Sequence, residues 1–481
     1  MQQQETATNR IGRDFTFLQL IQFALPAILT NLCQQLFRSL DDGLFVSRYV
    51  GEKALSSISL LGPMNSLIMA FAQVFSVGAS TLSAQRMGNN EQAEAKRIFT
   101  RMIILGLSVG AVFALMFNLF CDPLCRFLGA DDELIANSRI YVRLVLTDAP
   151  VNLIGAIFSS YYSTAGKPQM GLLCSIVNGS CNIIFDIILI AVMRLGVIGS
   201  SLSTVLGEVA VALIGLIFFS SKKHEIHFIK PEGRYLSTFR DTWKSGFSQF
   251  INSISFGVIG FVTNKTLLSV FGANGVAANT IINDLRTILN AAFVGYVTCI
   301  GPVIAYNYGS KNAKRLKRIL SYNLYFWLFG TIAVTIIGQL LKGPLISIFF
   351  GENASKELYD MTYLGLTIEF CSCIFTCGCI FIMRMFVALG TPKTASILTV
   401  SRNFIVRMSM LLLLPAIFGS IGIWFAIPVA EFISFCIGAA LVIANADNYG
   451  YGRSGLALRM QPELSVDEMK QLITESGSSE D

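Results

Sequence analysis

The sequence predicts an all-α polytopic membrane protein, with twelve transmembrane helices in two six-helix lobes related by a pseudo-twofold axis along the membrane normal. Its composition, its apolar runs and an internal repeat predict this fold. Of the 481 residues, 53% are hydrophobic and 14% charged, and the mean hydropathy is +0.61, which soluble domains do not show. Because a helix needs about 20 residues to cross a bilayer, the chain holds about a dozen spans. Backbone groups in lipid must be satisfied internally, so the spans are helices.

The apolar runs give the order of the spans. Six are predicted near residues 16–38, 54–82, 99–120, 140–161, 170–192 and 199–220. Six more are predicted near residues 246–268, 276–305, 319–340, 360–386, 396–416 and 422–445. The chain is therefore expected to consist of an N-terminal lobe (1–220), a basic linker (221–244), a C-terminal lobe (245–445) and a polar tail (446–481).

Basic residues in alternate loops orient the bundle, because loops rich in Lys and Arg remain in the cytoplasm. They occur after the second span, after the eighth span and in the linker, at Arg86, Lys96, Arg97, Arg101, Lys311, Lys314, Arg315, Lys317, Arg318, Lys222, Lys223, Lys230, Arg234, Arg240 and Lys244. Loops on the other side are rich in acids. We therefore expect a multi-pass protein of the cell (cytoplasmic) membrane with both termini and the linker in the cytoplasm.

An ordered series of matches relates the two halves. Residues 51–98 align without a gap to 272–319, and Gly51, Gly88 and Lys96-Arg97-Ile98 meet Gly272, Gly309 and Lys317-Arg318-Ile319. Further along, Gly166-Lys-Pro meets Gly390-Thr-Pro, Gly196 meets Gly419, and Glu208 meets Glu431. A repeat of six spans keeps both halves in the same orientation, which is typical of alternating-access transporters.

The strongest candidate site lies between Asn178 and Glu208. Asn182 and Asp186 are four residues apart in an apolar helix and so share one face. An aspartate in such a run costs about 2.5–3.5 kcal/mol on insertion scales, so it indicates function. Thr204 and Glu208, after a Gly-rich turn, supply further oxygen ligands. The alternative is a hydrogen bond that only holds two helices together.

Other intramembrane charges have two interpretations. Structural roles are favoured for the arginines, but Arg402 is also a candidate for the substrate cavity or its gating, together with Asp148, Glu208, Glu369 and Glu431. The cysteines at 371–379 are interpreted as small packing residues, because they occupy more than one helix face without a histidine. We expect no cofactor, and no metal beyond a possible Na⁺ at the coupling site.

The motifs resemble those of the multidrug and toxic compound extrusion (MATE) family of cation-coupled exporters, and within it the bacterial MepA-like branch. The resemblance extends from about residue 16 to residue 445. Its carriers are Asp42-Gly-Leu-Phe-Val-Ser-Arg48, Gly88-Asn-Asn, Asn182-Ile-Ile-Phe-Asp186, Gly199-Ser-Ser-Leu-Ser-Thr204, Gly301-Pro-Val-Ile-Ala-Tyr-Asn-Tyr-Gly309, Ser401-Arg402-Asn403 and Gly419-Ser-Ile-Gly-Ile-Trp424. The resemblance implies an ion-coupling site at Asp42, Asn182, Asp186 and Thr204, with H⁺ or Na⁺ as the coupling ion.

The predicted function is a cation-coupled multidrug antiporter that exports organic cations and amphipathic drugs through an apolar cavity with few acids. Small-molecule drugs and membrane lipid are the expected partners, with no nucleic acid and no obligate protein partner. A lipid-linked oligosaccharide flippase of similar architecture is the nearest rival, and its cavity should present several cations to phosphates. A membrane-embedded enzyme is disfavoured because the chain lacks an HExxH motif and a phosphate-binding loop.

Overall fold

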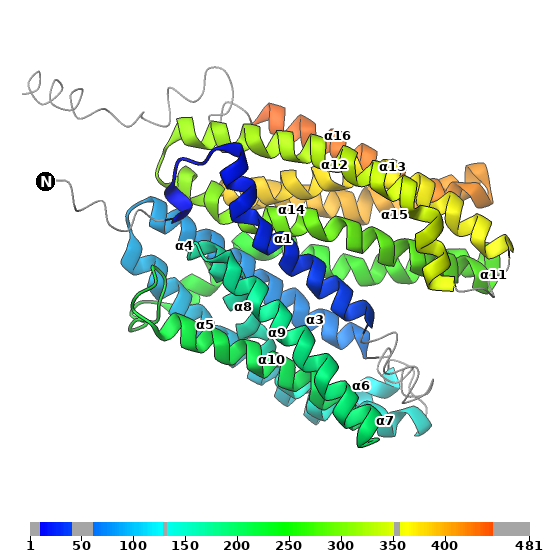
Figure 1. Ribbon diagram of the computed structural model, residues 1–481, viewed down its shortest axis with the longest axis horizontal. Helices are drawn as coiled ribbons and strands as arrows, with labels where there is room; N and C mark the ends of the chain where they lie inside the picture. The colour runs from blue at the N-terminus through cyan, green and yellow to red at the C-terminus, as the bar shows by residue number, and fades with distance from the viewer. Residues whose placement is uncertain (1–9, 41–60, 128–131, 351–355, 446–481) are drawn as a thin grey trace, which may run out of the picture.

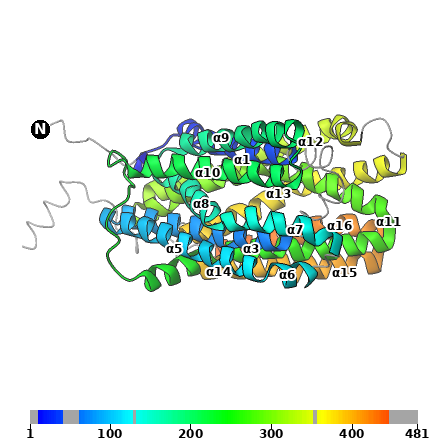
Figure 2. The ribbon, with the colours of Figure 1, turned by 90° about the horizontal axis from the view of Figure 1, so that it is seen from below.

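A computed structural model describes residues 10–40, 61–127, 132–350 and 356–445, and within these ranges it contains helices and no strand. Twelve of the described helical segments are long and apolar enough to cross a membrane, as the sequence predicts. Figure 1 shows the bundle as two halves, with the first half of the chain in blue to green and the second in green to orange. Figure 2 shows that the long helices of both halves run along the same axis. The predicted all-helical, two-lobed architecture is confirmed.

The first half begins with a short helix and contains six spans. Its helices are η1 (Arg10–Gly12), α1 (Phe17–Leu40), α3 (Gly62–Gln73), η3 (Val74–Gly78), α4 (Ala79–Gly88), α5 (Gln92–Leu119), α6 (Cys121–Phe127), α7 (Asp132–Leu144), η4 (Leu146–Asp148), α8 (Ala149–Thr164), α9 (Pro168–Asp186), η5 (Ile187–Val192) and α10 (Val197–Ser220). Here η3 and η5 are π-helical segments that interrupt longer helices.

The second half repeats this plan with fewer interruptions. Its helices are α11 (Tyr235–Gly309), α12 (Ala313–Phe350), α13 (Lys356–Ala388), α14 (Pro392–Val400), η7 (Ser401–Val406, π-helical), α15 (Arg407–Phe418) and α16 (Ser420–Ala444). α11 forms two spans that meet at Gly272, where the backbone leaves the helical conformation (φ 62°, ψ −152°). Several helices are longer than the apolar runs because polar residues extend their ends, as Lys314 and Arg315 do at the start of α12.

Large apolar side chains cover the outside of the bundle. Ile217 is 74% exposed, and Leu340 and Ile443 are each 75% exposed. In water such side chains would be unfavourable, whereas lipid solvates them. The inside is packed with aromatic rings, among them Phe99 and Phe219, whose centroids lie 4.8 Å apart. This distribution is typical of a protein surrounded by lipid.

The repeat predicted from the sequence is visible in the backbone. Gly196 precedes α10 with φ 58° and ψ −131°, and Gly419 precedes α16 with φ 63° and ψ −146°. Only glycine adopts this conformation without strain. Gly51, which aligns with Gly272 in the sequence, lies outside the described residues.

The two halves meet closely at the end of the bundle that holds the linker, at the left in Figure 1. A Cβ atom added to Gly88 would collide with the carbonyl oxygen of Tyr306, and one added to Gly309 would collide with the carbonyl oxygen of Gln85. Residues 85 and 88 align with 306 and 309 in the repeat, so the contact is reciprocal, as expected across a pseudo-twofold axis. The Gln85 amide also donates a hydrogen bond of 2.9 Å to the Ala388 carbonyl oxygen of α13.

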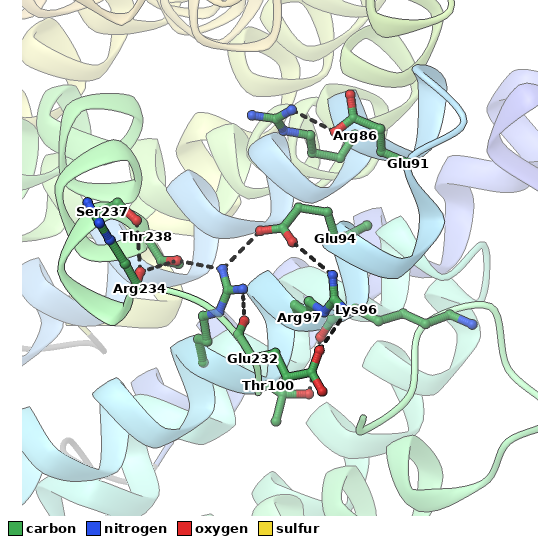
Figure 3. Close-up of polar contacts among 12 residues, drawn as sticks. Arg86, Glu91, Glu94, Lys96, Arg97, Thr100, Glu232, Arg234, Ser237 and Thr238 are labelled. Carbon is green, nitrogen blue, oxygen red and sulfur yellow. Dashed lines mark hydrogen bonds and ion pairs between the residues drawn. The ribbon is translucent and has the colours of Figure 1, made fainter. Parts of the chain in front are cut away.

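Residues 221–234 connect α10 to α11 and are tied to α5 of the first half. Figure 3 shows Glu94, Arg97, Glu232 and Thr238 gathered at this place. The buried guanidinium of Arg101 donates to Glu94 Oε1 (2.9 Å), to Thr238 Oγ1 (3.0 Å) and to the backbone oxygen of Glu232. Arg97 forms an ion pair of 2.9 Å with Glu232. The connection is therefore a fixed strap that joins α5 to the start of α11.

Candidate functional site

Asp186 lies at the end of α9, where this helix passes into the π-helical segment η5. Its side chain is completely buried. When the acid is ionised, the hydroxyl of Ser203 on α10 donates a hydrogen bond to Asp186 Oδ1. π-bulges of this kind are frequent at functional sites. The carboxyl group thus links the two helices that the sequence singled out.

The Ser203 hydroxyl has a second acceptor beside it. The backbone oxygen of Ser200 lies 2.8 Å from Ser203 Oγ. A hydroxyl has one hydrogen, and a carbonyl oxygen can only accept. Both contacts are hydrogen bonds at the same time when Asp186 is protonated. The carboxyl O–H of Asp186 then donates to Ser203 Oγ, and the Ser203 hydroxyl donates to the Ser200 backbone oxygen. The geometry suits the protonated acid as well as the carboxylate.

The other predicted coupling residues lie near Asp186 or outside the described structure. Asn182 is half-buried one turn before Asp186 on the same face of α9. The Thr204 hydroxyl donates to the Ser200 backbone oxygen of its own helix (3.1 Å). Asp42 lies outside the described residues. Among the described residues the hydroxyl that contacts Asp186 is that of Ser203, which the sequence analysis did not single out although it lies in the Gly199–Thr204 motif.

A second group of acids lies further along α10. Glu208 accepts a hydrogen bond of 2.9 Å from the Asn152 amide of α8. The carboxyl group of Asp148, a buried residue at the junction of η4 and α8, lies close to that of Glu208. Two neighbouring carboxylates repel each other, so a proton on one of them favours the pair. Asp148 and Glu208, predicted separately, therefore form one pair.

In the second half, Glu431 of α16 is enclosed by two arginines. Arg402 donates two hydrogen bonds to it, Nε to Oε2 (2.9 Å) and Nη2 to Oε1 (3.0 Å), and Arg407 Nη2 donates to Oε1. Glu431 has no exposed surface. Charge-assisted bidentate pairs are strong, and a buried ion remains in place only with such compensation. The predicted structural role of Arg402 has a clear basis here.

Glu369 of α13, the other predicted acid, forms an ion pair of 3.3 Å with Arg286 of α11. The Arg286 guanidinium also donates to Asn283 Oδ1 (2.6 Å). Glu369 is 6% exposed, so this acid is buried by its partner helix and its arginine. Glu369 thus contributes to packing between α11 and α13.

A cavity of about 340 Å³ lies in the second half and is closed on one side by α1. Its lining comes from α1, α11, α13, α14, η7 and α15: Asn31, Gln34, Gln35, Gln249, Asn252, Ile259, Arg286, Thr287, Asn290, Ala291, Val294, Thr376, Ile380, Met383, Arg384, Thr399, Arg402, Asn403 and Arg407. Of the predicted site residues, Arg402 is in this lining, and Glu431 lies behind it. The sequence predicts an apolar cavity with few acids; no acid occurs among the described lining residues, and by residue type the lining is mixed, because eleven of its nineteen residues are Asn, Gln or Arg.

The described histidines, cysteines and acids form no metal-binding cluster. Among the described residues no group of three or more His, Cys, Asp or Glu side chains lies close enough together to hold a metal ion. Cys373 and Cys377 instead approach the Asn290 side-chain oxygen, with Sγ at 3.6 Å and 3.5 Å. These thiols pack α13 against α11.

A family model described as MatE matches residues 26–188 and 248–413. The multidrug export protein MepA of Staphylococcus aureus (strain bovine RF122 / ET3-1) is 27% identical over 440 residues, which cover 89% of this chain and 93% of the relative. MepA of Staphylococcus saprophyticus is 26% identical over 440 residues, with the same coverage. The outward-facing structure of a multidrug resistance MATE family transporter of the MOP superfamily superposes with a TM-score of 0.86, at 20% identity, over 93% of this chain and all of the other.

Proposed function

The chain belongs to the MatE family of multidrug export transporters, and on this premise we propose that it is a cation-coupled antiporter of the cell membrane, driven by H⁺ or Na⁺. In this proposal the chain is a transporter and not an enzyme. It moves amphipathic drugs by alternating access between its two halves. The observation that carries the proposal is Asp186: a completely buried acid between two helices, next to a hydroxyl whose contacts are all satisfied when the acid is protonated.

Coupling follows from the change of charge at Asp186. A bare carboxylate in this setting is unfavourable because burial removes its water. A bound proton neutralises it, and Na⁺, a hard cation that prefers oxygen ligands, does the same with Asp186, Asn182 and Thr204 as ligands. Asp42 belongs to the proposed set through the family motif alone. Neutralisation favours one packing of α9 against α10 and loss of the ion favours the other, which is coupling by differential affinity for two states.

Substrates in this proposal are small amphipathic molecules. Organic cations are the class that the sequence predicts. The described part of the cavity lining is electrostatically unfavourable for them because it presents arginines and no acid. Amphipathic zwitterions meet the same cavity with a group of each charge. Membrane lipid is the surrounding medium, and the proposal needs neither a nucleic acid nor a second protein chain.

One observation favours the second candidate, a flippase for lipid-linked oligosaccharides. Its cavity should present several cations, and four arginines line the described cavity: Arg286, Arg384, Arg402 and Arg407. Three of the four are bonded to glutamates, however, which removes much of their capacity for phosphate. A flippase also has no use for a buried titratable site at Asp186. The antiporter is therefore the better-supported function.

The test of the proposed function separates the gradient from the substrate. Purified protein in proteoliposomes, with a pH gradient and a Na⁺ gradient imposed one at a time, should accumulate a fluorescent drug against its gradient with one of the two ions. Asp186→Asn keeps the shape, removes the titratable charge and should abolish uphill transport, while drug binding persists without its dependence on the ion. Asp122→Asn, a change to an exposed acid outside the spans, is the matched control. Near-normal uphill transport by Asp186→Asn would contradict the proposal.

The direction of export rests on the proposed topology, with both termini and the linker in the cytoplasm. The basic residues of the linker strap support this orientation. In a background without native cysteines, an impermeant thiol reagent should label a cysteine at position 353 in intact cells and leave one at position 232 unlabelled. The reverse pattern would overturn the topology and leave the fold intact.

A further inference from the structure

We propose that the cavity of the second half binds the anionic group of an amphipathic substrate, with Arg384 as the side chain that holds it. The inference rests on the proposed function, since it names the substrate class of that transporter: carboxylates and other oxyanions on an apolar or zwitterionic body. It starts from the balance of charge around the cavity.

The other three arginines of the lining are compensated. Arg286 pairs with Glu369, and Arg402 and Arg407 share Glu431. Arg384 forms neither an ion pair nor a hydrogen bond with any described residue, although it is mostly surrounded by protein. Its half-buried guanidinium has five N–H donors and no acceptor, and the cavity leaves room for an acceptor beside it. Arg384 is therefore the group whose bonding an anion would complete.

The lining as a whole favours negative charge. The Arg402–Glu431–Arg407 group carries one more positive charge than negative, Arg384 adds another, and no acid occurs among the described lining residues. In a region of low dielectric constant this excess repels a cation that lacks an anionic group. The amides of Gln249 and Asn252 add N–H donors on the α11 side.

The position of Arg384 places the anion where the two halves meet. Arg384 lies one turn before the end of α13 and lines both the main cavity and a hollow of about 20 Å³. That hollow is bounded by Ser80 and Thr81 of α4 in the first half and by Pro302 of α11 in the second. A cavity of about 340 Å³ is within the range of small-molecule sites. A substrate anion at Arg384 would thus be held at the floor of the cavity, beside the junction of the halves.

The test compares two dyes that differ by one carboxylate: tetramethylrhodamine with its free carboxylate, and its methyl ester. Fluorescence polarisation is measured with the full chain in phosphatidylcholine nanodiscs, without any gradient. The parent protein should bind the free carboxylate about tenfold more tightly than the ester, as expected for one charge-assisted hydrogen-bonded pair. Arg384→Gln should abolish this preference and leave ester binding unchanged, and Arg384→Lys should retain part of it. Arg240→Gln, at an exposed arginine of α11, should behave like the parent.

Each outcome decides the inference. Equal or tighter binding of the ester by the parent overturns it, as does an unchanged preference in Arg384→Gln. Unchanged ester binding in Arg384→Gln shows that this variant is folded. Repeating the titration with phosphatidylglycerol in the nanodiscs separates the sources of the anion: competition in the parent but not in Arg384→Gln assigns the site to a lipid headgroup, and no competition assigns it to soluble amphipaths. Because no gradient is used, failure of uphill transport leaves this test intact, and a preference for the ester leaves the proposed antiport intact.

Discussion

Glu208 and Glu431 occupy equivalent positions of the repeat and have opposite surroundings. Glu208 faces another carboxyl group, that of Asp148, and the Asn152 amide. Glu431 faces two guanidiniums. The same residue on the same scaffold is therefore a member of a proton-sharing pair in one half and the centre of an ion cluster in the other. The two halves share their helical scaffold but differ in the charged residues that surround this glutamate.

The origin of the difference lies in the partner positions. At the repeat offset that joins Glu208 to Glu431, Arg402 falls on Gly179, and a Cβ atom at Gly179 would collide with the Phe37 ring. The first half has no space there for an arginine. At the offset that joins Gly166 to Gly390, Asp148 falls on Ser372, whose hydroxyl donates to the Glu369 backbone oxygen (2.8 Å). Each half thus lacks the group that defines the other.

Removing the acid from the ion cluster tests this contrast with the largest expected effect. Glu431→Gln leaves Arg402 and Arg407 buried beside each other without compensation, which should lower the free energy of unfolding by about 3–5 kcal/mol. Thermal unfolding of the purified protein in detergent measures the change. A melting temperature like that of the parent would mean that Glu431 is not the counter-ion that stabilises the two arginines.

The matching change in the first half should have a much smaller effect. Glu208→Gln keeps an oxygen that accepts from Asn152 and removes the need for a proton shared with Asp148, so the free energy of unfolding should stay within about 1 kcal/mol of the parent. The same unfolding assay serves as the measurement. A loss of stability as large as that of Glu431→Gln would show that the two glutamates are equally structural, and the contrast would fail.

The exposed ion pair between Asp122 and Arg139 is expected to contribute least to the free energy of unfolding. Asp122 accepts a hydrogen bond of 2.6 Å from Arg139 Nε, and the hydrogen bonds of Arg139 hold the pKa of the Asp122 carboxyl below its usual value. The pair therefore stabilises the protein above the ordinary aspartate pKa, and its contribution is lost as the pH falls through the lowered one. Because both side chains are exposed, Asp122→Asn should leave the melting temperature unchanged at neutral pH within error. A clear shift at neutral pH that vanishes on acidification would reveal a stronger pair than exposure allows.

The sequence predicted those features that depend on local pattern. Hydropathy located twelve spans, and the repeated glycines at 196 and 419 marked two turns with the same backbone conformation. A charged residue within the apolar run at 183–192 indicated a buried acid, and Asp186 is buried. These features need no knowledge of which helices are neighbours.

Features that depend on helix rotation and on distant contacts escaped prediction. Ser203 and Thr204 differ by about 100° around α10; the sequence analysis named Thr204, whereas the hydroxyl that contacts Asp186 is that of Ser203. Arg286 and Glu369 are 83 residues apart in the chain and lie on different helices. Their pairing, and the lack of such a partner for Arg384 among the described residues, could be seen only in the packed bundle. The amides and arginines of the cavity lining likewise depend on which helices face one another.

The glycine contact between Gly88 and Gly309 has a consequence for the speed of the transport cycle. At Gly88 and Gly309 the helices α4 and α11 touch through backbone atoms, so these two contacts contain no side chain that must change rotamer, whereas the Gln85 amide bonded to the Ala388 carbonyl oxygen is a side-chain contact beside them. In the proposed alternating-access cycle, separation of the halves at these two glycines would be a rigid-body step, and the contacts could re-form in register because they are reciprocal. A methyl group at either glycine would act as a wedge, and Gly88→Ala would provide a protein whose resting population is shifted toward the opposite access state.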